Sequence, residues 1–205
     1  MRASDGSIAA VDGGWAKNFG GAGGIGTGIA VDNSSVYITG YFSGGNFTTP
    51  ALTRKGSKDA FVFKLAASDG GVTWAQGYGG PPTPTTPPYT PPAGNIAGYG
   101  IAVDSGGDIY MSGTLAQSTN QTPPLARIAG AGSADAVVLK LAGTDGSVIW
   151  AKNFGGSASW THGAGIALDA SGNPYLGGFM TGNLTTPPLT KIGTRDVFVL
   201  KMRVS

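Results

Sequence analysis

Hydrophobic residues occur in short runs along the whole chain, and each run is bounded by Gly, Asn, Asp, Ser or Pro. In the first part of the chain, such runs cover residues 28–32, 36–42, 59–65 and 72–78. Val, Ile, Phe, Tyr and Thr are frequent in these runs, as is typical of strands, and the bounding residues favour turns. The pattern therefore predicts short β-strands, which we name strands a to d within each unit.

Three landmarks of this pattern each occur three times. The first is a heptapeptide that begins with Trp and ends with Gly-Gly, and the second is a G-I-A-[VL]-D segment that forms strand a. The third is a strand c that opens with Asp and closes with Lys. A repeated unit of four antiparallel strands is typical of propeller blades. The landmarks begin at Trp15, Trp74 and Trp150, at Gly28, Gly100 and Gly165, and at Asp59, Asp135 and Asp196.

The three units resemble the bacterial β-propeller repeat often called SBBP. The resemblance rests on G-I-A-V-D, a Tyr-containing strand, D-A-F-V-x-K-L, D-G-x-x-x-W and F-G-G, and it covers nearly the whole chain outside a Pro-rich stretch. The third unit departs from it with Pro174 before its Tyr. A weaker likeness exists to NHL propellers through strands a and b, and to the tryptophan-docking repeats of quinoproteins through residues 145–150. The resemblance implies a fold, with no fixed activity attached to it.

The expected fold class is all-β, with a β-propeller-type array of three four-stranded antiparallel blades. The last blade lacks a strand d of its own, and we expect a strand d from the N-terminus of another chain to complete it. The expected division is an N-terminal strand d and connection at 1–27, blade one at 28–80, a Pro/Thr-rich connection at 81–99, blade two at 100–156, and blade three at 157–205.

The two ends of the chain carry complementary parts of one blade. Residues 8–20 match a strand d without its blade, and the third unit has strands a, b and c alone. A bare sheet edge favours pairing with another chain, and pairing within one chain would close fewer blades than the roughly four to eight of known propellers. We therefore expect an exchange of strands d between chains, which gives a six-bladed dimer or a filament. The alternative is a window of a longer array, because Met1 occupies the register of Leu65, Leu141 and Met202.

Composition narrows the classes of function. Gly accounts for 37 of 205 residues and all 11 acidic residues are Asp, which disfavours a helical fold. A net charge of +2 and no basic run longer than Arg54-Lys55 exclude a nucleic-acid surface. No run reaches the roughly 18 apolar residues of a membrane-spanning helix, so we expect no membrane insertion. The absence of Cys excludes disulfides and thiolate chemistry, and a secretion signal has been removed or lies outside these residues.

The sequence offers little for catalysis. His162 is the one His, so a multi-histidine metal site within one chain is excluded. Ser159, His162 and Asp169 can be written as a triad, but Asp169 belongs to the repeated a–b turn, whose counterparts Asp32 and Asp104 have no His nearby. We interpret these Asp residues as turn residues that bond their own backbone. The spacing of a calcium loop is absent as well, so we predict no metal, no cofactor and no enzymatic activity.

Aromatic residues divide into two groups. One Trp per unit at a fixed position predicts packing residues that fill the wedge between successive sheets, namely Trp15, Trp74 and Trp150. Rings on the d–a connections are candidate ligand contacts, because exposed rings can stack on sugars. These candidates are Trp160, His162, Tyr89 and Tyr99.

The Asp that opens each strand c and the Lys that closes it are five residues apart, and so lie on opposite faces of a regular strand. We predict solvated strand ends rather than a ring of ion pairs. The three Lys residues are Lys64, Lys140 and Lys201.

N-x-[ST] sequons occupy the same b–c loop in all three units, and each is followed by Pro. They are candidate glycosylation positions, and the favoured interpretation is a turn motif that needs Asn, Thr and Pro. The Pro/Thr-rich stretch at 81–92 predicts an exposed polyproline II spacer whose Thr residues are candidates for O-linked sugars. The candidate positions are Asn33, Asn46, Asn120, Asn183, Thr83, Thr85 and Thr86.

Every strong pattern explains folding or assembly, and none brings together a nucleophile, a base and an electrophile. We therefore predict a non-enzymatic structural or adhesive protein, extracellular or at the cell surface, that self-assembles through residues 1–20 and the edge of the third blade. The alternative is a lectin-like, glycan-binding propeller module. A hydrolase or quinoprotein forms a third class, which a bound cofactor or a turnover lost in His162→Ala would support.

Overall fold

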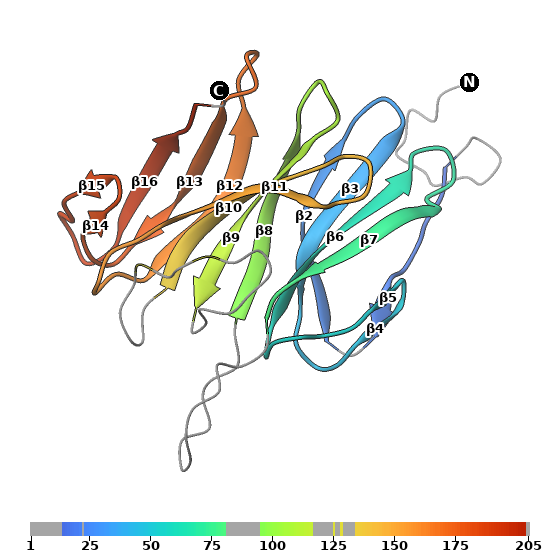
Figure 1. Ribbon diagram of the computed structural model, residues 1–205, viewed down its shortest axis with the longest axis horizontal. Coiled ribbons are helices and arrows are strands. Elements are labelled where there is room, and N and C mark those ends of the chain that lie inside the picture. The colour runs from blue at the N-terminus through green and yellow to red at the C-terminus, as the bar shows by residue number, and fades with distance from the viewer. Residues whose placement is uncertain are drawn as a thin grey trace, which may run out of the picture.

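The described part of the chain is built from β-strands and contains no helix, as the sequence predicts (Figure 1). Three antiparallel sheets form its body, two with four strands and one with three. These sheets do not close into a propeller ring, so the all-β class is confirmed while the propeller arrangement stays a prediction. The computed structural model describes residues 14–21, 23–80, 95–116, 125, 128 and 134–203.

Within each sheet the strands follow one another in chain order, which confirms the order a-b-c-d in the first two units and a-b-c in the third. The first sheet contains β2 (Gly24–Val31), β3 (Ser35–Phe42), β6 (Asp59–Ala66) and β7 (Val72–Tyr78). The second contains β8 (Asn95–Val103), β9 (Ile109–Ala116), β10 (Ala134–Leu141) and β11 (Val148–Phe154). The third contains β12 (Thr161–Leu168), β13 (Pro174–Met180) and β16 (Asp196–Lys201).

Short strands lie within the b–c loops of the first and third units. They pair with one another and, in the first unit, with the N-terminal segment through β1. The short strands are β1 (Gly20–Gly21), β4 (Phe47–Thr49), β5 (Ala51–Leu52), β14 (Leu184–Thr185) and β15 (Pro188–Leu189).

The three sheets stand side by side, and their first strands, β2, β8 and β12, approach closely (Figure 1). A Cβ atom on Gly28 would lie 2.7 Å from the carbonyl oxygen of Tyr99, and one on Gly100 would lie 2.9 Å from the backbone nitrogen of Ile166. The Gly that opens the repeated G-I-A-V-D segment therefore allows one backbone to touch the next. A β-bulge precedes this Gly in each strand.

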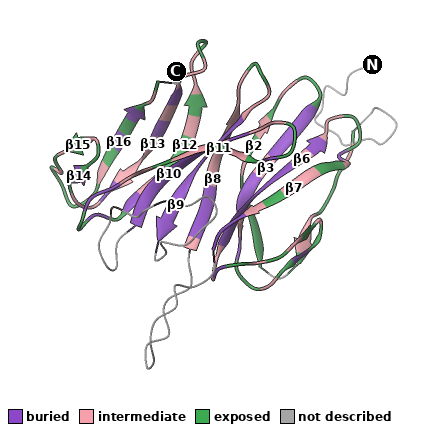
Figure 2. Cartoon of the chain, viewed as in Figure 1, coloured by how far each residue is buried: buried purple, intermediate pink, exposed green. Residues whose placement is uncertain are grey.

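Hydrophobic side chains fill the space between neighbouring sheets. Figure 2 shows β9 and β10 of the second sheet buried along most of their length. Strand β10 contributes side chains to the hydrophobic clusters on both sides of the second sheet, because its side chains alternate between two faces. Val137 and Leu139 join the cluster shared with the first sheet, while Ala136 and Val138 join the cluster shared with the third. The second sheet is therefore buried on both faces.

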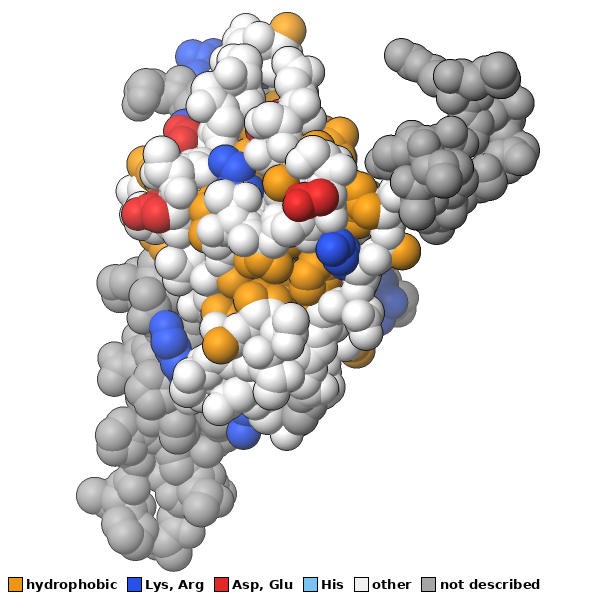
Figure 3. Space-filling model, turned by 90° about the vertical axis from the view of Figure 1, so that its right-hand side faces the viewer, with side chains coloured by type: hydrophobic (Ala, Val, Ile, Leu, Met, Phe, Trp, Pro, Cys, Tyr) orange, Lys and Arg blue, Asp and Glu red, His pale blue; other side chains and the backbone are white. Residues whose placement is uncertain are grey.

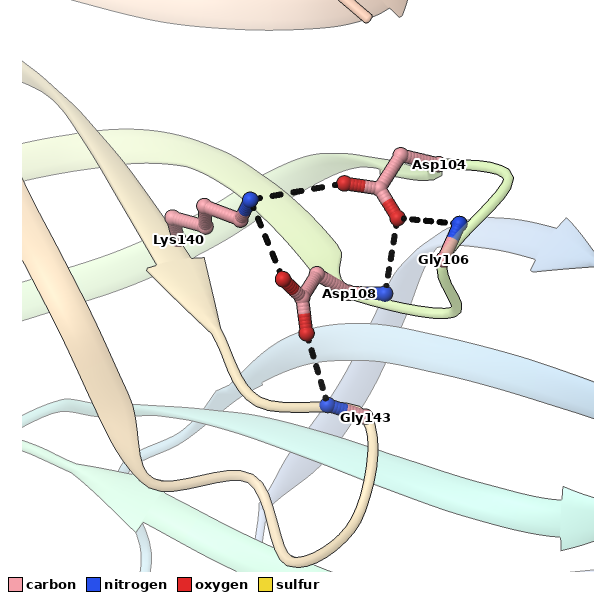
Figure 4. Close-up of polar contacts among 5 residues, drawn as sticks. All are labelled: Asp104, Gly106, Asp108, Lys140 and Gly143. Atoms are coloured by element: carbon pink, nitrogen blue, oxygen red, sulfur yellow. Dashed lines mark hydrogen bonds and ion pairs between the residues drawn. The ribbon is translucent and has the colours of Figure 1, made fainter. Parts of the chain in front are cut away.

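The repeated a–b turns follow the predicted mechanism, because Asp104 accepts hydrogen bonds from the backbone N–H groups of Gly106 and Asp108 at 3.0 and 2.9 Å. Asp32 and Asp169 accept equivalent bonds in their own turns. Figure 4 shows the Nζ atom of Lys140 between two carboxylates, 3.4 Å from Asp104 and 3.0 Å from Asp108. The ammonium group of Lys140 thus neutralises the two carboxylates, in the place where a metal ion could otherwise bind.

The prediction of solvated ends for strand c is wrong for the first two units. Asp59 and Asp135 are 1% and 0% exposed, because strand d and the preceding loop cover them. Asp59 accepts backbone N–H bonds from Lys55 and Gly56, which replace the lost water. The Lys residues form no ring: Lys140 and Lys201 pair with a–b turns, and Lys64 donates to the carbonyl of Gly143 at 2.8 Å.

Candidate self-assembly interface

Strand d of one sheet attaches to the next sheet through its Trp, as the predicted packing role requires. The Nε1 atom of Trp74 donates to the carbonyl of Gly143 at 3.2 Å, and the hydroxyl of Tyr78 donates to the carbonyl of Gly146 at 2.8 Å. Both acceptors lie in the c–d turn of the second sheet. Trp150 packs against the cluster between the second and third sheets.

Residues 14–21 lie on the first sheet in the position that a strand d of a preceding sheet would take. Trp15 donates from Nε1 to the carbonyl of Ala67 at 2.9 Å, in the c–d turn of the first sheet. The rings of Phe19 and Phe63 pack edge to face with centroids 5.6 Å apart. Within the described part of the chain, residues 14–19 belong to no β-strand, and no strand c pairs with them.

The third sheet carries the complementary gap. Among the described residues β16 pairs with β13 alone, whereas β6 and β10 each have a strand d on their other side. Val197 and Val199 are 83% and 67% exposed, while Phe198 and Leu200 on the opposite face are buried against the second sheet. The edge strand therefore exposes one apolar face and a row of backbone groups that can pair.

Two hollows border this open sheet. One, of about 640 Å³, lies beside β16 and is lined by Ile192, Val197 and Val199 among others. The second, of about 610 Å³, surrounds Trp150. Its lining residues are Lys140, Ile149, Trp150, Lys152, Phe154, Met202 and Arg203.

The opposite end of the molecule presents an apolar face of the first sheet. Figure 3 views the molecule from this end and shows hydrophobic side chains gathered in the middle of the face. Ile29 and Val31 of β2 pair with Ile38 and Val36 of β3 on this face, and they are exposed by 68% and 63%. Phe61 and Phe63 of β6 belong to the cluster on which Trp15 and Phe19 pack. The two ends thus expose the two opposite faces of one kind of sheet.

The structure brings together two of the predicted ligand contacts, Tyr99 and His162, whose ring centroids are 4.3 Å apart. The row continues on both sides, because Tyr41 lies 6.1 Å from Tyr99 and Phe179 stacks on His162 at 4.9 Å. The guanidinium of Arg195 lies 4.5 Å from the ring centre of Phe179. Sequence reasoning missed the outer members, although Tyr41 and Phe179 share one repeat position after a Gly of strand b.

Burial of His162 and the nearby charge of Arg195 lower the pKa of its imidazole. The Nδ1 atom of His162 lies 3.0 Å from the hydroxyl of Thr114. Trp160 is 43% exposed, which agrees with its predicted exposure. The fourth candidate, Tyr89, lies outside the described residues.

The triad of Ser159, His162 and Asp169 that the sequence allows does not form in the structure. The hydroxyl of Ser159 is buried and contacts the hydroxyl of Thr161 and the carbonyl of Gly182. Asp169 faces Lys201 at 3.1 Å, and backbone and side-chain bonds from Asn173 lower its pKa to about 2. In the described ranges, no group of three or more His, Cys, Asp or Glu could hold a metal ion.

The sequon side chains hold their own loops. Asn46 accepts a hydrogen bond from the backbone N–H of Arg54 at 2.9 Å, and Asn183 accepts one from Lys191 at 2.8 Å. This supports the interpretation of the sequons as a turn motif, and Asn33 lies exposed in its a–b turn. Glycosylation stays a prediction. Asn120, Thr83, Thr85 and Thr86 lie outside the described residues.

Comparison of the chain with protein-family models and with curated proteins finds no match. The resemblance to the SBBP repeat therefore stays a prediction. In the part of the chain that the structure describes, no helix has the length and apolar character needed to cross a membrane.

Proposed function

We propose that this protein is a non-enzymatic, propeller-type structural protein that assembles by exchanging a strand between copies. One observation within the described residues carries the proposal: residues 14–21 lie as a strand d without its strand c, while β16 is a strand c without its strand d. The N-terminal segment of one copy would add to the β16 edge of another copy by antiparallel backbone pairing. Assembly would be the function of the molecule.

Packing supports the same arrangement. When the N-terminal segment of a second copy pairs with β16, the first sheet of that copy comes to lie against Val197 and Val199. Its own apolar face, with Ile29 and Val31, is the partner surface. Full burial of a Val or Ile side chain contributes roughly 1.5–3 kcal/mol, so a few such contacts offset part of the entropy cost of association.

The contact is heterologous, because the two surfaces that meet are different. Mutual exchange between two copies would give six sheets, within the range of roughly four to eight blades for closed propellers, whereas successive exchange would give a filament. We also propose that the protein acts outside the cell or at its surface, where a fibre or an adhesive layer would act.

The first test is the mass of the protein in solution. Light scattering after size exclusion should give either two chains, about 41 kDa from twice 20.4 kDa, or long particles in negative-stain images. Deletion of residues 1–20 should abolish both species. A monomer before deletion, or an unchanged mass after it, would contradict the proposal.

A second candidate, glycan binding, is favoured by the exposed ring of Trp160 and by the adjacent pair Tyr99 and His162. Exposed indoles commonly contact sugars through their apolar face. Binding on a broad glycan array that is lost in Trp160→Ala and retained in Ile149→Ala, an exposed residue elsewhere, would support it. Silence across the array would count against it.

A further inference from the structure

Between the first and second sheets, an Asp-Gly turn lies on the indole of the preceding strand d. Gly146 has a φ of +74°, and a Cβ atom there would lie 2.8 Å from the ring of Trp74 and 2.7 Å from the side chain of Gln76. The Nε2 atom of Gln76 donates to the carbonyl of Asp145 at 3.1 Å. A turn without a side chain at this point therefore fits closely against the ring.

The same contact occurs between the N-terminal segment and the first sheet. Gly70 has a φ of +69°, and its Cβ would lie 2.5 Å from the ring of Trp15 and 2.8 Å from the side chain of Lys17. In both turns the Asp carboxylate accepts the N–H of the second residue after it, at 2.9 Å for Asp69 and 2.8 Å for Asp145. Two contacts with one geometry define a recurrent receptor for an Asp-Gly turn.

The third Trp has the receptor without the turn. Trp150 occupies the register of Trp15 and Trp74 in the repeated heptapeptide. Around it lies the hollow of about 610 Å³ described above, and no Asp-Gly turn of the described residues enters it. Lys152 and Arg203 line the hollow, together with Lys140, whose ammonium is paired with Asp104 and Asp108. The charges of Lys152 and Arg203 favour an acidic occupant.

We propose that the hollow around Trp150 binds the turn Asp5-Gly6-Ser7 of a second copy. This triplet repeats Asp145-Gly146-Ser147, the turn seated on Trp74. In the seated turns the Asp lies five residues before the following Trp, whereas Asp12 lies three and Asp5 ten residues before Trp15. Asp12-Gly13 therefore leaves too little chain for the turn, while Asp5-Gly6 leaves enough, with five residues more than the seated turns use. The inference rests on the proposed strand exchange, and this contact would set the register in which the N-terminal segment pairs with β16.

Disulfide cross-linking tests the contact directly, because the chain contains no Cys. A copy with Ser7→Cys is mixed with a copy with Lys152→Cys, dissociated, reassembled and mildly oxidised. We expect a covalent dimer on a non-reducing gel. The matched control pairs Ser7→Cys with Gln76→Cys, which has the register of Lys152 but faces a hollow already filled by the turn of its own chain.

The outcomes separate the two proposals. Cross-linking at 152 and not at 76 supports the turn receptor. Assembly by light scattering with no cross-link, with equal cross-links at both positions, or with a cross-link from Gly14→Cys instead of Ser7→Cys overturns the receptor and leaves strand exchange standing. Absence of assembly in the unmodified protein overturns both.

Charge reversal gives a second measurement. Asp5→Lys and Lys152→Glu should each weaken association by about tenfold, because each places like charges together, and the double variant should recover most of the loss. Equal weakening in the double variant, or no change in either single variant, would contradict the proposal.

Discussion

Strands β10 and β16 have nearly the same sequence and very different surroundings. Both open with Asp, close with Lys and carry hydrophobic residues between them. Val138 of β10 is 0% exposed, whereas Val199, at the same repeat position of β16, is 67% exposed. Their similar sequences show that the burial of a strand c depends on its neighbours, and that β16 has the composition of a strand covered on both faces.

This difference shows which part of the molecule leaves apolar side chains uncovered, namely β16. A strand that faces water on one side usually alternates hydrophobic and polar residues, and β16 does not. Its exposed positions are Val197 and Val199, and the residue before the strand is a charged Arg195. The pattern therefore indicates a covered state, and the largest predicted effects separate the covered strand from the uncovered one.

The sharpest contrast is expected for a charge placed at the shared Val position. Val138→Asp buries a carboxylate between the second and third sheets and should lower the free energy of unfolding by about 4 kcal/mol or more. Val199→Asp should change the stability of the dissociated chain by no more than about 0.5 kcal/mol, because the side chain is exposed. Urea unfolding at low protein concentration measures both.

The same pair of variants tests assembly. Val199→Asp should prevent association at concentrations where the unmodified protein assembles, because covering β16 would bury the carboxylate. Similar stability losses in the two variants, or undiminished assembly of Val199→Asp, would contradict the comparison.

The next effect concerns the two tryptophans. Trp74→Ala removes packing on the first cluster and the bond to Gly143, and should cost about 2–3 kcal/mol of unfolding free energy. Trp150→Ala should cost about 1–2 kcal/mol, since its hollow lacks a seated turn, and should also weaken association. Thermal unfolding and light scattering of both variants check this, and a larger stability loss for Trp150→Ala would reverse the expected order.

The repeats made much of the fold predictable. Strands b, c and d of the first unit were predicted within a residue of β3, β6 and β7, because turn residues bound each run of hydrophobic residues. These properties are local, and local sequence specifies them.

Contacts between sheets were harder to predict from the sequence. The bond from Trp74 to Gly143 joins residues 69 positions apart, and no pattern specifies which carbonyl receives it. The burial of Asp59 depends on a loop that folds back on it, so the charge alone suggested a solvated end. The row of Tyr99, His162 and Phe179 arises because sheets approach at the bulges of strand a, a geometry that appears only after packing.

A smaller effect is expected for the glycine of the seated turn. Gly146→Ala should cost about 2 kcal/mol, from its positive φ and from contact with the ring of Trp74. Gly172→Ala is the matched control, because its φ of +79° is similar while a Cβ there meets nothing within 4 Å. It should cost about 1 kcal/mol. Equal losses in chemical unfolding would mean that the ring yields and that the turn is not closely held.

The smallest effect concerns the first residue of strand c. Burial raises the pKa of Asp59 above its ordinary 3.8, whereas backbone N–H groups of Ile192 and Gly193 lower the pKa of Asp196 below that value. If a strand d covers β16, Asp196 takes on the surroundings of Asp59 and its pKa rises on assembly. The assembled form then binds more protons than the free chain, so association strengthens as the pH falls through the raised value toward the lowered one.

As the pH falls from neutral through the raised pKa of a covered Asp196, the association constant should therefore rise. Sedimentation at several pH values measures it. Asp196→Asn removes the titrating group and should flatten this part of the profile. A profile that is flat in the unmodified protein, or that weakens toward acid and is unaffected by Asp196→Asn, would mean that β16 stays uncovered on assembly.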